Sequence, residues 1–195
     1  MNAEFHVPLP GEHHAHNLLA AITLVSFLDL SPEQMQKGLS TFKTAYGRTE
    51  TYSLKNGVQL IGDYYNSNPT SVAAALKLLQ ETGLKSSSNG VTHAVLGDML
   101  ELGEQEESFH RELAALLQAH KISYVWLYGP RMKWLKDELT SQIANATSQV
   151  HYFTSHDELS KQLMQKISAK DSVLIKGSRG LKMEVVLKKI LESMN

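Results

Sequence analysis

The sequence contains no cysteine. This absence excludes disulfides, thiolate metal sites and cysteine nucleophiles, and it suits a protein of the reducing cytoplasm. An excess of either charge is also lacking, because 19 lysines and arginines stand against 20 aspartates and glutamates. Proteins that hold nucleic acid or an anionic membrane over a broad surface need a basic excess. We therefore expect neither nucleic acid nor a membrane as a partner.

Long apolar runs are lacking as well. The most apolar stretch near the beginning, residues 18–30, is interrupted by Thr23, Ser26 and Asp29, and no basic leader precedes it. Because such a stretch is too short to span a bilayer, it predicts a buried helix and not a signal peptide. The chain also lacks the pattern G-x-x-x-x-G-K-S/T, with which many nucleotide-binding proteins hold phosphates.

The composition that remains is that of an ordinary globular protein, with 42% hydrophobic and 20% charged residues. Residues 1–45 predict two short helices. The first covers the apolar run after Asn17, and the second begins after Ser31, which precedes Pro32 as a helix N-cap does. Two short helices make a poor core, so we expect them to pack against the rest of the chain or against something beyond it.

From residue 46 onward, strand and helix patterns alternate. Residues 49–54 and 58–62 favour strands and flank Asn56-Gly57, the strongest short signal for a hairpin. Further strands are predicted over 93–96, 124–128, 150–153 and 172–175, helices over 70–82, 104–120, 130–143, 156–167 and 181–192, and a polar loop over 85–90. This alternation predicts an α/β fold with a mostly parallel sheet, covered by helices and with the hairpin at one edge.

Three polar segments follow predicted strands, over residues 62–69, 97–103 and 176–180. In parallel sheets ligands gather at the carboxyl ends of the strands, so we expect the three segments on one rim that carries a site. Asp63 could accept hydrogen bonds from a sugar, and Tyr65 could orient a flat or polar ligand. Alternatively, Asp63, Asn66 and Asn68 satisfy the donors of a turn and of a helix N-terminus.

The segment that follows the last strand offers two cations and a hydroxyl. Lys176, Ser178 and Arg179, with glycines beside them and a helix after them, suit a phosphate or a carboxylate. The alternative is a solvated turn between a strand and a helix.

For other polar residues we weigh structural roles against functional ones. His13, His14 and His16 crowd one turn, but no second cluster of ligands accompanies them, so we expect packing or hydrogen-bonding roles and not a metal. Two carboxylates, Asp98 and Glu101, could act as a pair or could cap the helix near residue 104. We expect His110 to be a hydrogen-bonded histidine inside that helix.

Several segments of the chain form a set with a fixed order. They are Pro8-Leu9-Pro10-Gly11-x-His13-x-x-x-Asn17-x-x-Ala20-Ala21, Gly47-Arg48-x-Glu50, Asp63-Tyr64-Tyr65-Asn66-Ser67-Asn68-Pro69-x-Ser71, Val95-Leu96-Gly97-Asp98-Met99-Leu100-Glu101-Leu102-Gly103 with His110, and Lys176-Gly177-Ser178-Arg179 with Met183-Glu184. Each is weak alone, but together they are specific and run through nearly the whole chain. In this order they resemble the Mur ligase family.

The resemblance implies that residues 1–45 are the helical C-terminal end of the central ATPase domain and that residues 46–195 are the Rossmann-like C-terminal domain. The members that the chain is most similar to use ATP and Mg²⁺ in the bacterial cytoplasm. They join D-alanyl-D-alanine to UDP-N-acetylmuramoyl-tripeptide for peptidoglycan, through an acyl phosphate that the amine attacks.

The resemblance also implies roles for particular residues. ATP binding is implied for His14, Asn17, Arg48 and Asp63, and substrate binding for Tyr65, Asn66, Asn68, Ser178 and Arg179. Lys176 and Arg179 are the candidate catalytic residues, and no metal ligand is expected in the chain. One departure is His14, which stands where the family has an asparagine. An imidazole replaces only one of the two hydrogen bonds that an amide makes to adenine.

The family's uridine-nucleotide domain, phosphate loop and magnesium ligands have no counterpart in these residues. We therefore expect no catalysis by this chain alone, and we expect the missing N-terminal and central domains to be its packing partner. A free-standing, non-catalytic module that binds a ligand or a protein is the alternative. A ligase for another amino acid, or for folate polyglutamylation, is a third reading.

Overall fold

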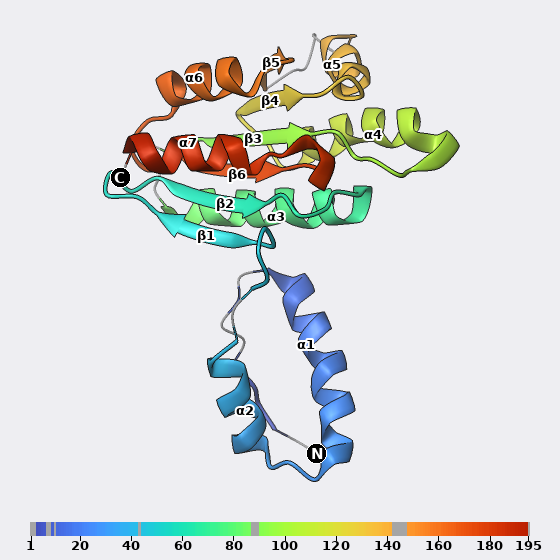
Figure 1. The fold of residues 1–195 in the computed structure, drawn as a ribbon, viewed down its shortest axis with the longest axis vertical. Coiled ribbons are helices and arrows are strands. Elements are labelled where there is room, and N and C mark those ends of the chain that lie inside the picture. Colours follow the sequence, from blue (N-terminus) through green and yellow to red (C-terminus); the bar gives the residue numbers. More distant parts are fainter. Residues whose placement is uncertain are drawn as a thin grey trace. The chain divides into compact units, whose positions relative to one another are not determined.

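The computed structural model describes residues 3–6, 9, 11–42, 44–86, 90–141 and 148–194. The chain divides into two compact units, Met1–Ala45 and Tyr46–Asn195, which are called the helical unit and the sheet unit below (Figure 1). Each unit is described by itself.

The helical unit contains helix α1 (Glu12–Val25), a 3-10 turn over Ser26–Leu28 and helix α2 (Pro32–Ser40). The second helix begins as predicted. The hydroxyl of Ser31 accepts a hydrogen bond from the N–H of Gln34, and the side chain of Gln34 accepts one from the N–H of Ser31. This capping box, followed by Pro32 at the first helical position, satisfies donors that a helix start leaves open.

The prediction that the first helix is buried is wrong for this structure. Leu18 is buried, but the side chains of Leu19 and Leu24 are 65% and 71% exposed. The second half of helix α1, residues 18–25, is apolar around most of its circumference, and a unit with two short helices has too few side chains to cover such a surface. Pro8, Pro10 and the side chain of His13 lie outside the described residues.

The sheet unit is built on six strands. They are β1 (Glu50–Ser53), β2 (Gln59–Asp63), β3 (Thr92–Gly97), β4 (Tyr124–Tyr128), β5 (Gln149–Phe153) and β6 (Ser172–Lys176). The strand order is β1-β2-β6-β3-β4-β5, and every neighbouring pair is parallel except the antiparallel hairpin β1–β2 at one edge. The predicted mostly parallel sheet with an edge hairpin at Asn56-Gly57 is therefore confirmed.

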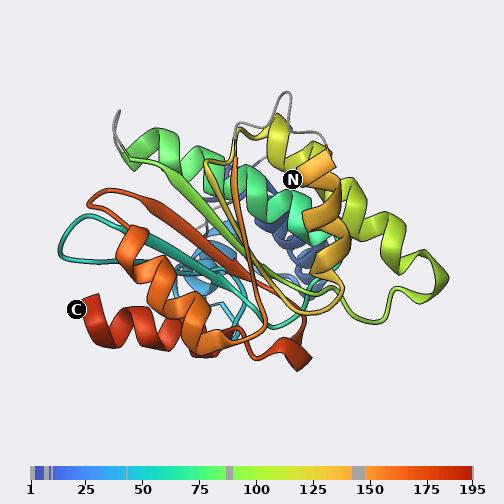
Figure 2. The same cartoon turned by 90° about the horizontal axis from the view of Figure 1, so that it is seen from above.

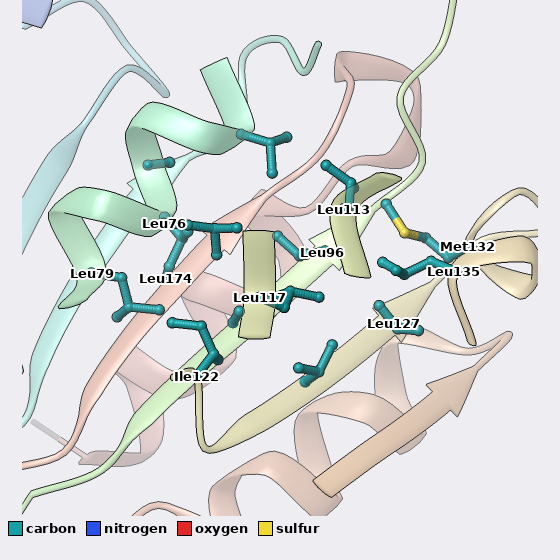
Figure 3. Close-up of a cluster of buried hydrophobic side chains, with 14 of the residues drawn as sticks. Leu76, Leu79, Leu96, Leu113, Leu117, Ile122, Leu127, Met132, Leu135 and Leu174 are labelled. Atoms are coloured by element: carbon teal, nitrogen blue, oxygen red, sulfur yellow. The ribbon is translucent and has the colours of Figure 1, made fainter. Parts of the chain in front are cut away.

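Helices cover both faces of this sheet (Figure 2). Helices α3 (Pro69–Ser86), α4 (Glu106–Ala119) and α5 (Met132–Ser141) lie on one face, and α6 (His156–Lys166) and α7 (Glu184–Met194) lie on the other. Figure 3 shows the core of the first face, where Leu76, Leu113 and Leu135 from the helices pack with Leu96 and Leu127 from the strands. Burying one such leucine side chain contributes about 1.5–3 kcal/mol to the free energy of unfolding.

The helix ends differ from the predicted ones. Helix α3 continues past residue 82 through Gly83 to Ser86, and a Cβ at residue 83 would lie 2.8 Å from the Thr92 side chain, so the glycine permits this close approach. The expected helix start at residue 104 is a 3-10 turn, Gly103–Gln105, before α4. The last helix begins at Glu184 and not at 181, since Lys182 has a left-handed conformation with φ of 50°. Residues 87–89 and 142–143 lie outside the described ranges.

Within the ranges that the structure describes, none of the helices has the length and apolar character needed to cross a membrane.

Candidate functional site

The strand order brings the three predicted polar segments to one rim. Strand β6 lies between β2 and β3 and runs parallel to both, so their carboxyl ends meet. In the register of the sheet, Lys176 is the partner of Asp63 on one side and of Leu96 on the other. The segments after the three strands therefore start side by side, at the edge where parallel sheets bind ligands.

A buried ion pair lies at the centre of this rim. The ammonium of Lys176 donates to Asp63 Oδ2 at 2.6 Å and to the carbonyl of Asn66 at 3.0 Å. The Lys176 side chain is only 1% exposed, whereas that of Asp63 is 19% exposed. Burial lowers the pKa of Lys176, and the charge and hydrogen bond of Asp63 counteract this effect. The predicted ligand-binding carboxylate therefore already has one oxygen committed to the strand next to it.

Arg48 stands on a short segment whose backbone is held on both sides. Its neighbours Gly47 and Thr49 both have positive φ, of 69° and 49°. The N–H of Gly47 donates to Glu50 Oε1 at 3.0 Å, and the N–H of Thr49 donates to Asp63 Oδ1 at 3.3 Å. The exposed guanidinium of Arg48 lies 4.5 Å from the centre of the Tyr65 ring. Arg48, Asp63 and Tyr65 are thus brought together, as an accessible cation beside a carboxylate.

Ser178 joins the segments of all three strands. Its hydroxyl accepts a hydrogen bond from the N–H of Leu100 at 2.8 Å and donates one to the carbonyl of Ser67 at 3.4 Å. Its own N–H donates to the carbonyl of Asp98 at 3.0 Å. Ser178 is buried. These contacts give it a structural task at the rim, because it holds three loops in one arrangement.

Arg179 is the accessible cation of the last segment. Its side chain is 54% exposed, and Nη1 lies 3.1 Å from Glu184 Oε1. The guanidinium also lies 5.5 Å from the centre of the Tyr46 ring. An exposed guanidinium held by a carboxylate and an aromatic ring is suited to an anionic ligand.

The two asparagines of the rim serve the backbone in this structure. Asn68 Oδ1 accepts a hydrogen bond from the N–H of Ser71 at 2.8 Å, and therefore caps helix α3. Asn66 Oδ1 accepts from the N–H of Ser67 at 2.8 Å. Both asparagines are otherwise exposed. The capping role foreseen for Asn68 is confirmed.

Asp98 does not cap the helix near residue 104. It is buried, and its Oδ1 accepts a hydrogen bond from the N–H of Met132 at 2.9 Å, at the start of α5. Burial raises the pKa of Asp98, opposed by the backbone N–H groups of Met132 and Arg131. Glu101 is exposed and has φ of 63°, so the two carboxylates do not share one environment. Local sequence patterns could not predict this cap, because the capped residue, Met132, lies 34 residues away from Asp98.

His110 is hydrogen-bonded on both sides, as predicted. Nδ1 lies 2.6 Å from the carbonyl of Glu106, and Nε2 lies 3.1 Å from the N–H of Met99. This geometry assigns the ring proton to Nδ1, which donates to the carbonyl, while Nε2 accepts. His110 therefore holds the loop that follows strand β3, a role that the sequence alone does not reveal.

In the helical unit, His14 and Asn17 lie about one turn apart on α1, so they share a face. Asn17 is exposed and His14 is partly buried. Among the residues whose placement is described, no group of three or more His, Asp or Glu side chains is arranged to hold a metal ion.

Comparison with known proteins gives a consistent result over nearly the whole chain. The family model described as Mur ligase, glutamate ligase domain matches residues 47–179. The UDP-N-acetylmuramoyl-tripeptide–D-alanyl-D-alanine ligase of Bacillus subtilis (strain 168) is 34% identical over 189 residues, which cover 97% of this chain and 40% of that protein.

Solved structures show the same fold. MurF from Acinetobacter baumannii superposes with a TM-score of 0.80 at 28% identity, over 97% of this chain and 40% of that one. MurF ligase from Thermotoga maritima, solved in complex with ADP, superposes with a TM-score of 0.77 at 24% identity, over 95% of this chain and 39% of that one. The chain spans about two fifths of the length of these proteins.

Proposed function

Since the chain belongs to the Mur ligase family, through its glutamate ligase domain, we propose that it forms one wall of the active site of an ATP-dependent ligase. The ligase joins D-alanyl-D-alanine to UDP-N-acetylmuramoyl-tripeptide in peptidoglycan synthesis in the bacterial cytoplasm. The observation that carries this proposal is the rim itself. Two exposed guanidiniums, Arg48 and Arg179, flank the buried pair of Lys176 and Asp63 there, in a chain that is similar to such ligases over nearly all its length.

The rim suits a reaction in which negative charge develops. ATP, when bound, supplies the phosphoryl group that activates the carboxylate of the tripeptide. In our proposal Arg48 approaches the nucleotide's phosphates, while Arg179 faces the reaction centre, where a fixed cation stabilises the developing charge. The aromatic ring beside each guanidinium limits the motion of the arginine side chain. Less conformational entropy is therefore lost when the side chain becomes ordered around a ligand.

The buried residues support this surface in the proposed role. Lys176 reaches Asp63 and the carbonyl of Asn66, so it acts by orienting the carboxylate that meets the ribose. Tyr65, Asn66 and Asn68 provide the polar face toward the dipeptide, and Ser178 keeps the loops that carry them together. For Mg²⁺ the described residues offer no group of three ligands, so we assign the ion no ligand in this chain.

The helical unit belongs in this proposal to the central domain of the ligase. His14 and Asn17, on one face of α1, are proposed to contact adenine. The exposed leucines Leu19 and Leu24 are proposed to pack against the remainder of that domain. The chain spans about two fifths of its curated relatives and contains no phosphate loop, so we propose that these 195 residues alone do not catalyse the joining.

The test uses the isolated chain and a chimera. The chain, mixed with ATP, Mg²⁺, the tripeptide precursor and D-alanyl-D-alanine, should release no phosphate, while a chimera that joins it to the preceding part of the Bacillus subtilis ligase should be active. In the chimera Arg179→Ala should lower kcat/KM by about 100-fold, whereas Lys188→Ala, an exposed cation on α7, should not change it. Turnover by the isolated chain would refute the incomplete-site proposal, and an unchanged kcat/KM in Arg179→Ala would refute the placement of Arg179 at the reaction centre.

A binding experiment separates the alternative function. A free-standing module would bind D-alanyl-D-alanine as the isolated chain and would gain no activity in the chimera. Calorimetric titration of the chain with the dipeptide, together with the activity of the chimera, distinguishes the two.

A further inference from the structure

The carboxylate of Glu50 accepts three hydrogen bonds, one from the segment that carries Arg48 and two from tyrosines, on β1 and directly after β2. Oε1 accepts from the N–H of Gly47 at 3.0 Å. Oε2 accepts from the hydroxyl of Tyr52 at 3.0 Å and from that of Tyr64 at 2.7 Å. Both oxygens are therefore committed inside the protein. Glu50 is placed to fix its neighbours and not to meet a ligand.

The two tyrosines are dependable donors to this carboxylate. Burial, and then the hydrogen bond to Glu50, raises the pKa of Tyr52 and that of Tyr64. Both hydroxyls therefore keep their protons at neutral pH. Tyr64 is itself buried, so it ties Glu50 to the core of the sheet unit. The N–H of Gly47 is in this way anchored to a rigid part of the molecule.

Hydrogen bonds hold the backbone on both sides of Arg48. The backbone before Arg48 is held by Glu50 and also by the N–H of Tyr65, which donates to the carbonyl of Gly47 at 2.9 Å. The backbone after it is held by the bond from Thr49 to Asp63. A guanidinium that lies over the Tyr65 ring at 4.5 Å needs this fixed backbone, because a cation–π contact at an exposed site contributes only about 0.5–1 kcal/mol.

We propose that Glu50 is a positioning residue, whose carboxylate sets the backbone at Gly47 so that the guanidinium of Arg48 lies on the Tyr65 ring and faces the rim. This inference rests on the proposed function only for what Arg48 then binds. Arg111 on α4 provides an internal contrast, because a direct ion pair with Glu107 in the same helix holds it. Loss of Glu50 should therefore displace Arg48 and leave Arg111 in place.

The test observes the two arginines in the 195-residue chain without any ligand. Protons over the face of an aromatic ring resonate upfield, so the side-chain signals of Arg48 should be displaced upfield in the NMR spectrum. Tyr65→Leu identifies these signals by abolishing the displacement. In Glu50→Ala the displacement should fall to less than half, while the signals of Arg111 keep their positions. Tyr52→Phe, which leaves the acceptor for Gly47 intact, should retain most of the displacement.

A conservative variant separates positioning from simple charge. Glu50→Gln keeps an oxygen that can accept from Gly47 but removes the negative charge, so it should restore most of the upfield displacement of Arg48. An unchanged Arg48 signal in a folded Glu50→Ala protein would overturn the inference, as would a Glu50→Gln protein that behaves like Glu50→Ala. If Glu50→Ala does not fold, Glu50→Asp takes its place, because its shorter carboxylate cannot reach all three donors. The upfield displacement of the Arg48 signals should then fall in Glu50→Asp, and an unchanged displacement would overturn the inference. A failure of the ligase function would appear separately, in the joining assay.

Discussion

Replacing Asp63 by asparagine is expected to destabilise the sheet unit more than replacing Lys176 by methionine. Asp63→Asn removes the negative charge beside the ammonium of Lys176, which is 1% exposed, and leaves it only uncharged acceptors, the carbonyl of Asn66 and the new amide oxygen. Removing one partner of a buried ion pair costs about 3–5 kcal/mol. Because Asp63 is 19% exposed and uncharged acceptors for the ammonium remain, we expect the lower end, about 3 kcal/mol.

Lys176→Met instead leaves the carboxylate of Asp63 without its lysine partner. Asp63 then keeps the N–H of Thr49 and can reach water, so the loss should be about 1 kcal/mol. The double variant, Asp63→Asn with Lys176→Met, removes both charges and should recover most of the stability that Asp63→Asn loses. Lys189→Met, which breaks the exposed pair with Asp157, is the matched control and should leave the denaturation midpoint unchanged.

The deficit of Asp63→Asn should also depend on pH. Burial lowers the pKa of Lys176 in the folded protein, and loss of Asp63 lowers it further. An unfolded lysine titrates near about 10.4. At pH values between the pKa of Lys176 in the folded variant and that of an unfolded lysine, the unfolded chain binds more protons than the folded one. The free energy of unfolding of the variant should therefore rise with pH, by up to about 1.4 kcal/mol per pH unit.

Both effects can be measured by guanidinium denaturation followed by tryptophan fluorescence. The two tryptophans of the chain, Trp126 and Trp134, lie in the sheet unit, so the signal reports on the relevant core. A loss of about 3 kcal/mol corresponds to about 6–12 °C in Tm for a unit of this size. The reasoning would be refuted if Lys176→Met cost as much as Asp63→Asn, or if the double variant recovered nothing.

Two further predictions concern histidine and glycine. Burial lowers the pKa of His93 and of His151, so the folded protein should lose stability as the pH falls below about 6.5, where an unfolded histidine takes up a proton. His93→Gln should flatten this dependence in denaturation midpoints, and an unchanged slope would contradict the assignment. Gly47→Ala should cost more than Gly103→Ala, although φ is 69° and 64° at the two sites. A Cβ at residue 47 would lie 2.9 Å from the Tyr64 ring, whereas nothing lies within 4 Å at residue 103. The left-handed conformation alone costs alanine about 1–2 kcal/mol, and equal thermal midpoints for the two variants would exclude the ring contact as a cause.

Local patterns were sufficient for much of the fold. The strand over Tyr124–Tyr128 was predicted at its observed bounds, and the hairpin at Asn56-Gly57 lies at the sheet edge where it was expected. These features depend on periodicity and turn chemistry, which neighbouring residues determine. Gly83 shows where local patterns fail. A glycine in a helical pattern usually indicates the end of the helix, but Gly83 lies inside α3 and allows the helix to approach Thr92, a contact that only the folded structure reveals.

The site was predictable as a location and not as a set of contacts. Strand ends predicted that Asp63 and Lys176 lie on one rim, but their pairing depends on the strand order, which joins residues 113 positions apart. The same reason explains Asp98, which caps a helix remote in sequence. The anchoring role proposed for Glu50 depends on Tyr64, whose side chain meets the carboxylate only after the hairpin has formed. The functional roles of the rim residues stay predictions until the variants are measured.

The central place of β6 has a consequence for how the protein is made. This strand is the last of the six to leave the ribosome, yet it pairs with β2 and β3, which are synthesised much earlier. Until β6 arrives, the facing edges of β2 and β3 lack their partner and offer unpaired backbone groups to other chains. Pairings between segments far apart in sequence form slowly, so the nascent chain is exposed to aggregation from the synthesis of β2 until β6 has emerged. A chaperone that shields these two strand edges would therefore act before the last strand is available, and a mutation that truncates the chain before Ser172 would leave the sheet in two halves.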